Sequence, residues 1–81
     1  MVIQVRLFAA VKDAAGTNTL ELELPDEATV ADLRRHMAED FPQMTDLLGR
    51  VMFAIDTEYA GDVRRIPPKG DVACIPPVSG G

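Results

Sequence analysis

The chain has 81 residues, of which 47% are hydrophobic and 26% charged, which is the composition of one small globular domain. A domain of this size buries a limited core, so we expect no deep, enclosed active site from this chain alone. Thirteen acidic residues against eight basic ones give a formal net charge of -5, which argues against nucleic acid as a partner because phosphates would meet no excess of positive charge.

Targeting and metal-binding signals are also absent from the sequence. Residues 1–16 contain no basic leader followed by a long apolar stretch, and no run approaches the roughly 18–20 apolar residues that cross a bilayer. We therefore expect a cytoplasmic protein without a membrane contact. The single cysteine, Cys74, excludes an internal disulfide, and no Cys/His cluster predicts a metal, so we expect this chain to bind no cofactor.

The first 24 residues predict two strands. Residues 1–8 alternate apolar and polar side chains, and residues 20–24 alternate leucine with glutamate, so each strand has one buried and one exposed face. An alanine-rich helical turn is expected at residues 9–15, ending at Gly16. The short connection between the strands favours an antiparallel hairpin.

One amphipathic helix follows the hairpin. Thr29 opens it, and Asp32 stands three residues later as a variant of the capping box. Pro42 ends it, because the residue before a proline disfavours the helical conformation. Four apolar side chains fall on one side of this helix: Val30, Leu33, Met37 and Phe41.

The second half of the chain predicts further strands. Residues 51–55 are apolar without alternation, which indicates burial on both faces or a central place in the sheet. Residues 57–65 are expected to form an edge segment or loop, and residues 72–75 a last short strand. An antiparallel hairpin, a helix crossing to a parallel central strand and a final strand make an α+β, ubiquitin-like β-grasp fold with a mixed sheet. We expect a β-grasp domain at residues 1–75 and an extended tail at residues 76–81.

The tail is the most informative segment. Pro76 and Pro77 stiffen the exit from the last strand, and Val78 and Ser79 add modest side chains. Because Gly80-Gly81 carries no side chain, its backbone passes a narrow channel, and six extended residues reach roughly 20 Å. This favours a slim arm that presents the carboxylate of Gly81 to the active site of another protein. The alternative is that the two glycines are only a frayed end.

The sequence resembles the MoaD-type sulfur carriers, which are the small subunits of molybdopterin synthase within the ubiquitin-like MoaD/ThiS family. Three short segments carry the resemblance, RLFAA at residues 6–10, TVADL at residues 29–33 and FAID at residues 53–56. The most specific segment is the ending GDVACIPPVSGG at residues 70–81.

The resemblance implies a chemistry at Gly81. An ATP-dependent adenylating enzyme, which uses ATP and Mg, would activate its carboxylate, and a sulfurtransferase or other sulfur donor would convert it to a thiocarboxylate. The tail, Pro76 to Gly80, would then insert into the large catalytic subunit. There, sulfur would pass to a cyclic pterin phosphate precursor and build the molybdopterin dithiolene of the molybdenum cofactor. The family assembles as a heterotetramer, and this chain would donate sulfur without being catalytic alone.

Other side chains have a functional and a structural interpretation. Phe8 and Ile75 could fill the core, but the parity of the first strand places Phe8 opposite its buried residues and favours a partner interface. For Cys74 we favour a small buried hydrophobe over a sulfur-accepting thiol. We expect His36 to be a solvated side chain rather than a general base, and the pair Arg34-Arg35 to be a solvated face.

Two other functions remain open from the sequence. The chain could be a sulfur carrier for thiamine biosynthesis or tRNA thiolation, although those endings usually lack the Pro-Pro-Val-Ser segment. It could also be a non-catalytic β-grasp interaction module whose Gly-Gly ending is incidental.

Overall fold

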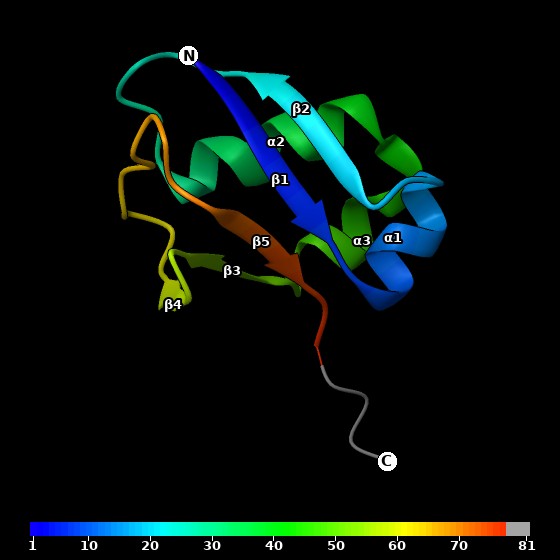
Figure 1. Cartoon of the computed structure of the whole chain (residues 1–81). Helices are drawn as coiled ribbons and strands as arrows, with labels where there is room; N and C mark the ends of the chain where they lie inside the picture. The colour runs from blue at the N-terminus through cyan, green and yellow to red at the C-terminus, as the bar shows by residue number, and fades with distance from the viewer. Residues whose placement is uncertain (78–81) are drawn as a thin grey trace.

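One mixed five-stranded sheet with helices on one face makes up the molecule, here a computed structural model that describes residues 1–77. The ribbon in Figure 1 shows the strands in front of the helices. In the order of the sheet, the strands are β2 (Thr19–Glu23), β1 (Val2–Leu7), β5 (Val72–Ile75), β3 (Met52–Ile55) and β4 (Glu58–Ala60).

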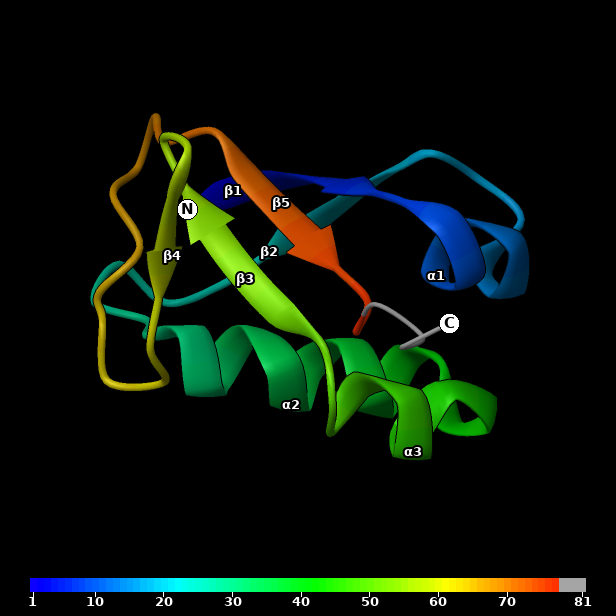
Figure 2. The same ribbon diagram turned by 90° about the horizontal axis from the view of Figure 1, so that it is seen from below.

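The helices cover the inner face and one end of the sheet. Seen from below, α2 (Val30–Asp40) lies across that face with α3 (Thr45–Leu48) beside it, and α1 (Ala9–Ala15) lies at the end of the sheet (Figure 2). A single 3-10 turn, η1 (Pro42–Met44), joins α2 to α3. Thr29 and Asp32 form the predicted capping box, and α2 ends before Pro42 as expected.

The strand pairing confirms the β-grasp fold and corrects one detail. β1 pairs antiparallel with β2 and parallel with β5, as in the predicted hairpin and mixed sheet. The prediction that residues 51–55 form a parallel central strand is wrong, because β5 lies at the centre and β3 is antiparallel to both of its neighbours. A continuous apolar run is the same in a central strand and in the strand next to it, so the sequence did not separate the two.

The hydrophobic core lies between the sheet and α2. Ile3, Val5 and Leu7 point inward from β1, and Val72 and Cys74 do so from β5. The predicted helix face packs against them, with Val30, Leu33 and Met37 fully buried and Phe41 partly buried. The period-two and period-3.6 patterns of the sequence therefore meet in one core.

Residues 1–77 carry neither a membrane-spanning helix nor a cluster of metal-binding side chains. None of the helices in this part of the chain combines the length and apolar character needed to cross a membrane. The same residues contain no group of three or more His, Cys, Asp or Glu side chains placed to hold a metal ion.

Candidate functional site

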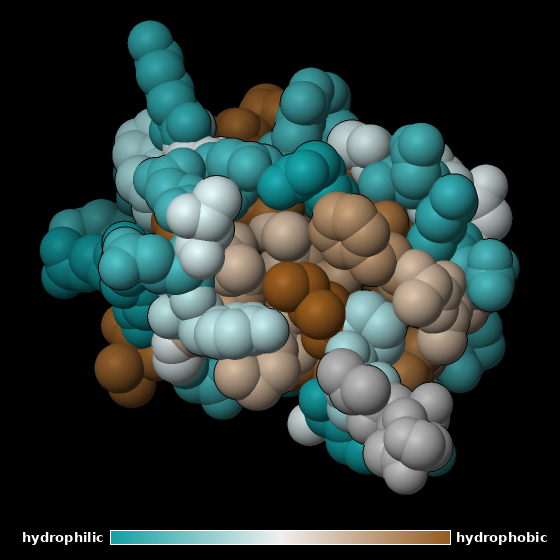
Figure 3. Space-filling model, turned by 60° about the horizontal axis from the view of Figure 1, so that its bottom comes forward, coloured by the Kyte–Doolittle hydropathy of each residue, from teal (hydrophilic) through white to brown (hydrophobic). Residues whose placement is uncertain are grey.

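The outer face of the sheet, away from the helices, carries a small hollow of about 240 Å³. We call it the docking hollow. Its lining combines small, apolar and charged residues: Arg6, Phe8, Ala54, Thr57, Tyr59, Asp71, Ala73 and Ile75. A view with the lower end of the sheet turned forward shows apolar surface gathered in the middle and hydrophilic side chains around it (Figure 3).

The strand register explains why a hollow forms here. Arg6 on β1, Ala73 on β5, Ala54 on β3 and Tyr59 on β4 are successive cross-strand partners, so the four side chains make one row across the sheet. The two alanines, which are less than 10% exposed, stand between two long side chains and leave a gap above the strands. The docking hollow therefore forms because two small side chains lie between two large ones in a single cross-strand row.

Apolar side chains border this row on the side of the tail. Phe8 is 42% exposed and Met52 is 49% exposed, while Ile75, the cross-strand partner of Met52, is partly buried. Tyr59 is 67% exposed at the far end of the row. Exposed apolar groups that gather in one patch are a feature of interaction surfaces, so these residues form a candidate interface.

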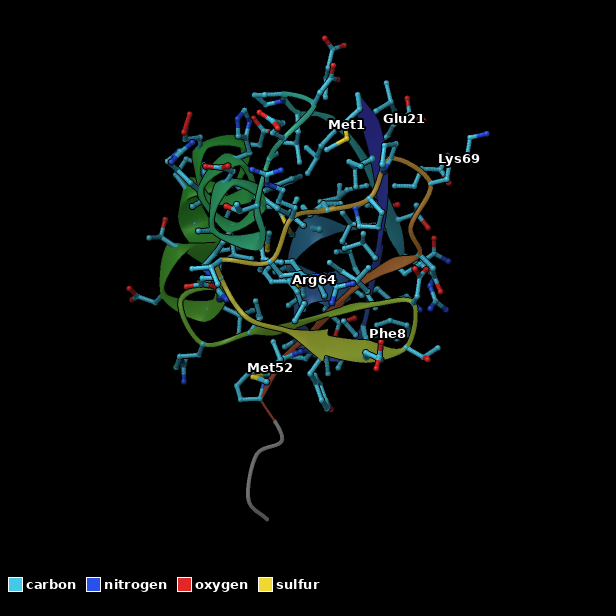
Figure 4. All side chains as sticks on the ribbon, turned by 90° about the vertical axis from the view of Figure 1, so that its left-hand side faces the viewer. Met1, Phe8, Glu21, Met52, Arg64 and Lys69 are labelled. Atoms are coloured by element: carbon cyan, nitrogen blue, oxygen red, sulfur yellow. The ribbon has the colours of Figure 1, made fainter. Side chains whose placement is uncertain are left out.

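The predicted position of Phe8 is confirmed. Figure 4 shows Phe8 and Glu21 on the side of the sheet away from the helices, as the parity of the first strand requires. The role of Phe8 and Ile75 as a partner interface stays a prediction. Sequence reasoning missed Tyr59 and Met52 because each lies in a strand of three or four residues, too short for an alternation to be recognised.

The root of the predicted tail adjoins the docking hollow. Ile75 ends β5 and lines the hollow, and the chain then continues into half-buried Pro76 and exposed Pro77. The other predicted tail residues, Val78, Ser79, Gly80 and Gly81, lie outside the described residues. Whatever binds over the hollow therefore meets the beginning of the tail as well.

An ion pair closes the polar end of the docking hollow. Arg6 donates from Nε to Asp71 Oδ1 at 3.0 Å and from Nη2 to Asp71 Oδ2 at 2.7 Å. The guanidinium carbon also lies 5.6 Å from the centre of the Phe8 ring, within the range of a cation–π contact. Charge and apolar surface are therefore adjacent in one site.

Cys74 lies beneath this surface and not on it. Its side chain is fully buried in the core, in agreement with the prediction of a small hydrophobe. Burial raises the pKa of the Cys74 thiol to about 12, with a smaller opposing effect from Arg34. At neutral pH the thiol keeps its proton, so it is unsuited to act as a nucleophile.

The prediction for Arg34-Arg35 is half wrong. Arg35 is 63% exposed and pairs with Asp32 and Glu39, as a solvated residue does. Arg34 instead donates from Nη1 to the carbonyl oxygens of Leu48 at 2.6 Å and Val51 at 2.9 Å. Arg34 serves as a structural link between α2 and the chain that enters β3.

His36, which was expected to be a solvated side chain, is half-buried rather than fully solvated.

The lining of the docking hollow combines apolar and polar side chains. Four of its eight residues are apolar, and the other four are Arg6, Thr57, Tyr59 and Asp71, of which Arg6 and Asp71 are bound to each other. An apolar centre with a polar edge matches the anatomy of a protein interface.

Comparison with known proteins identifies a family and relatives that this chain resembles over nearly its whole length. The model of the ThiS family matches residues 5–81. A molybdopterin synthase sulfur carrier subunit of Dictyostelium discoideum is 35% identical, with 96% of this chain and 94% of that protein covered.

Two solved structures share the fold. SAMP1 from Haloferax volcanii has a TM-score of 0.85 at 22% identity, and both chains are covered completely. A chain from the complex of subunits 1 and 2 of the molybdopterin-converting factor of Helicobacter pylori has a TM-score of 0.69 at 18% identity, also with full coverage of both chains.

Proposed function

Because the chain belongs to the ThiS family, we propose that it is the sulfur-carrier small subunit of molybdopterin synthase. The observation that carries the proposal is the position of the docking hollow at the root of the tail. A partner that covers the hollow receives the segment that starts at Pro76. The β-grasp domain thus supplies recognition, and the tail supplies the reacting group.

The proposed reaction takes place at Gly81. Its carboxylate attacks the α-phosphate of ATP in an adenylating enzyme that holds Mg, which gives an acyl-adenylate and releases pyrophosphate. A sulfurtransferase or other donor then provides the sulfur that displaces AMP and leaves a thiocarboxylate. The partner enzymes lower the barriers by positioning and by electrostatic stabilisation. We place the carrier in the cytoplasm together with these enzymes.

The proposed sulfur acceptor is a substrate that the large catalytic subunit binds. We place Phe8 and Ile75, together with Tyr59, against that subunit, with Pro76, Pro77, Val78, Ser79 and Gly80 leading Gly81 into its active site. There the sulfur of the thiocarboxylate attacks a cyclic pterin phosphate precursor, and water then hydrolyses the acyl–sulfur bond, which leaves the sulfur on the precursor and returns Gly81 to a carboxylate. A dithiolene contains two sulfur atoms, so each product consumes two charged carriers. A heterotetramer of two small and two large subunits fits this stoichiometry.

Intact-mass measurement tests the carrier chemistry. The chain is incubated with the adenylating enzyme of the pathway, ATP, Mg and a sulfur source, and a known carrier is treated in parallel. We expect one oxygen to be replaced by sulfur at the C-terminus in the wild type and no replacement in a variant without Gly81. An unmodified wild type beside a modified control carrier overturns the proposal.

A second experiment identifies the pathway. The thiocarboxylated chain is mixed with the large subunit and the cyclic pterin phosphate precursor, and dithiolene formation is measured. In parallel, it is offered to a thiazole-forming enzyme and to a tRNA-thiolating enzyme. We expect sulfur transfer only with the large subunit. Transfer only in one of the other mixtures identifies the chain as a carrier for thiamine biosynthesis or tRNA thiolation and contradicts the proposal.

A further inference from the structure

The polar end of the docking hollow has unused hydrogen-bonding capacity. A guanidinium carries five N–H donors in a rigid fork, and the bonds from Arg6 to Asp71 use two of them. The side chain of Arg6 is about half exposed and lines the hollow. Phe8 lies next to the same guanidinium. A group that bound here would meet an apolar ring and free donors together.

Asp71 is fixed by the backbone on which it lies. Its N–H donates to Asp56 Oδ1 at 2.9 Å, and its carbonyl oxygen accepts from the N–H of Asp56 at 2.9 Å. Asp56 and Thr57 form the two-residue turn between β3 and β4, with φ values of 51° and 71°. Neither is a glycine, so the left-handed turn is strained, and the two bonds to Asp71 help to hold it. Asp71 therefore offers Arg6 a rigid anchor.

The size of the docking hollow limits what enters it. Pockets for drug-sized molecules measure about 300–1,000 Å³, whereas this hollow is about 240 Å³ and open to the surface. It is suited to a single side chain placed over Ala54 and Ala73. The hollow is also continuous with the root of the tail, so the occupant comes from the protein that receives the tail.

We propose that Arg6, oriented by Asp71, determines specificity in this hollow by binding a carboxylate of the large subunit next to an apolar side chain that the same subunit inserts. The inference rests on the proposed function, since it takes the large subunit as the partner. Arg6 acts as a fork that fixes the direction of approach, and Asp71 acts through Arg6 as a positioning residue. A carboxylate is the acceptor that matches a guanidinium fork in both charge and geometry.

If the ion pair between Arg6 and Asp71 only stabilised the fold, its loss would lower stability and not specifically weaken binding to the large subunit. Both side chains are about half exposed, and exposed pairs contribute roughly 0–1 kcal/mol to folding. Loss of the pair should therefore leave the fold nearly intact. Measuring both the affinity for the large subunit and the stability of each variant therefore distinguishes a role in binding from a role in folding.

Affinity for the isolated large subunit from the same organism is the test. Dissociation constants are measured by calorimetry in about 0.15 M salt for the wild type, Arg6→Lys, Arg6→Gln and Asp71→Asn. Arg35→Lys and Arg35→Gln serve as matched controls, because Arg35 is an exposed, ion-paired arginine on α2. We expect Arg6→Lys to weaken binding about tenfold, which equals about 1.4 kcal/mol, since lysine keeps the charge but loses the fork.

Asp71→Asn separates positioning from net charge. It removes one negative charge beside Arg6, so simple electrostatics predicts tighter binding to an acidic group. If Asp71 positions Arg6, binding weakens several-fold instead. We expect Arg6→Gln to lose at least as much affinity as Arg6→Lys and the two Arg35 variants to bind like the wild type.

Several results overturn the inference. If Arg6→Lys binds the large subunit with wild-type affinity, the guanidinium fork is not needed for binding. If Asp71→Asn binds more tightly than the wild type, Asp71 does not position Arg6. A fall of more than about 8 °C in the Tm of Arg6→Lys, roughly 1 kcal/mol or more in a domain of this size, assigns the pair to folding instead. If the wild type neither binds the large subunit nor gains sulfur, the proposed function has failed. If the wild type binds and Arg6→Lys binds equally well, only the inference about Arg6 has failed.

Discussion

The two faces of the sheet use similar residues for opposite purposes. Phe53 on β3 points inward and is fully buried, whereas Phe8 at the end of β1 points outward and is 42% exposed. Successive side chains of a strand alternate between the faces, so one short segment contributes to both. The inner face excludes water permanently. The outer face keeps apolar area that only a partner removes from water.

The difference also lies in how the faces are filled. The inner face is filled by large aliphatic and aromatic side chains that meet α2. On the outer face, Ala54 and Ala73 lie between Arg6 and Tyr59, and the missing volume becomes the docking hollow. A core left with such a gap would lose stability. The outer face carries the gap without that loss because solvent fills it.

The largest effect is expected from the inner face. Replacing Phe53 with alanine leaves a cavity in the core and should reduce the free energy of unfolding by about 3–5 kcal/mol. Urea denaturation followed by circular dichroism measures it. Small domains have a total stability of roughly 5–15 kcal/mol, so part of this variant is expected to be unfolded. A loss below about 1 kcal/mol would contradict the assignment of Phe53 to the core.

Arg34 is expected to produce the next largest effect. Replacing it with glutamine removes the bonds to the carbonyl oxygens of Leu48 and Val51 and the ion pair with Asp62. Hydrogen bonds to charged groups contribute roughly 1.5–3 kcal/mol, so we expect a loss of about 2–3 kcal/mol in urea denaturation.

Arg35→Gln is the matched control for Arg34. It changes the same residue type one position along α2, where the side chain is 63% exposed, and should shift stability by less than about 0.5 kcal/mol. Equal losses in the two variants would show that Arg34 contributes through its charge rather than through its contacts.

Phe8 probes the outer face. Under the proposed function, Phe8→Ala should weaken binding to the large subunit by about 2 kcal/mol, close to 30-fold, because aromatic anchors dominate interface energies. Its stability should change by less than about 1 kcal/mol, since the ring is already 42% exposed.

Val2→Ala is the control for Phe8. Val2 is 53% exposed on the same strand and does not line the docking hollow, so its truncation should leave the affinity unchanged. If Phe8→Ala reduced stability as strongly as Phe53→Ala, the contrast between the two faces would be wrong.

Most of the fold could be predicted because it follows from local periodicity. The alternation in residues 1–8 placed Phe8 outward, and Thr29 with Asp32 marked the start of α2. The order of β3 and β5 could not be predicted, because both strands are short and apolar. Sheet order depends on long-range pairing that leaves no periodic signal in either strand.

The candidate site was predicted only in part for a similar reason. Phe8 was predicted from the parity of the first strand and Ile75 from its place beside the tail, whereas the buried face of the last strand could not be chosen from the sequence. Arg6 and Asp71 are 65 residues apart, and nothing in the local sequence of either indicates that they meet. Arg34 was misjudged because its partners are backbone carbonyls, which every residue possesses.

Cys74 allows the inner face to be tested by pH. Its pKa is about 12 in the fold and about 9 when exposed, so the folded protein keeps a proton that the unfolded chain releases. This contribution to stability is complete below pH 9 and is lost as the pH rises toward 12. We expect the wild type to lose up to about 1.4 kcal/mol per pH unit above pH 9 relative to Cys74→Ala. Parallel slopes for the two proteins in urea denaturation would place the thiol outside the core.

The smallest effect concerns the start of α2, the helix that covers the inner face. Hydrogen bonding from the backbone N–H of Thr29 is the main cause of a lowered pKa at Asp32. Desolvation opposes it, and the Thr29 hydroxyl and Arg35 lower the pKa by smaller amounts. A lowered pKa adds stability above the unfolded value of about 3.8 and loses it as the pH falls through the folded value. Asp32→Asn should therefore be less stable than the wild type at pH 7, and the two Tm values should converge as the pH falls below 3.8. Glu39→Gln makes the same change in charge at the other end of α2 and serves as the control. If both variants respond to pH in the same way, general charge rather than the cap is responsible.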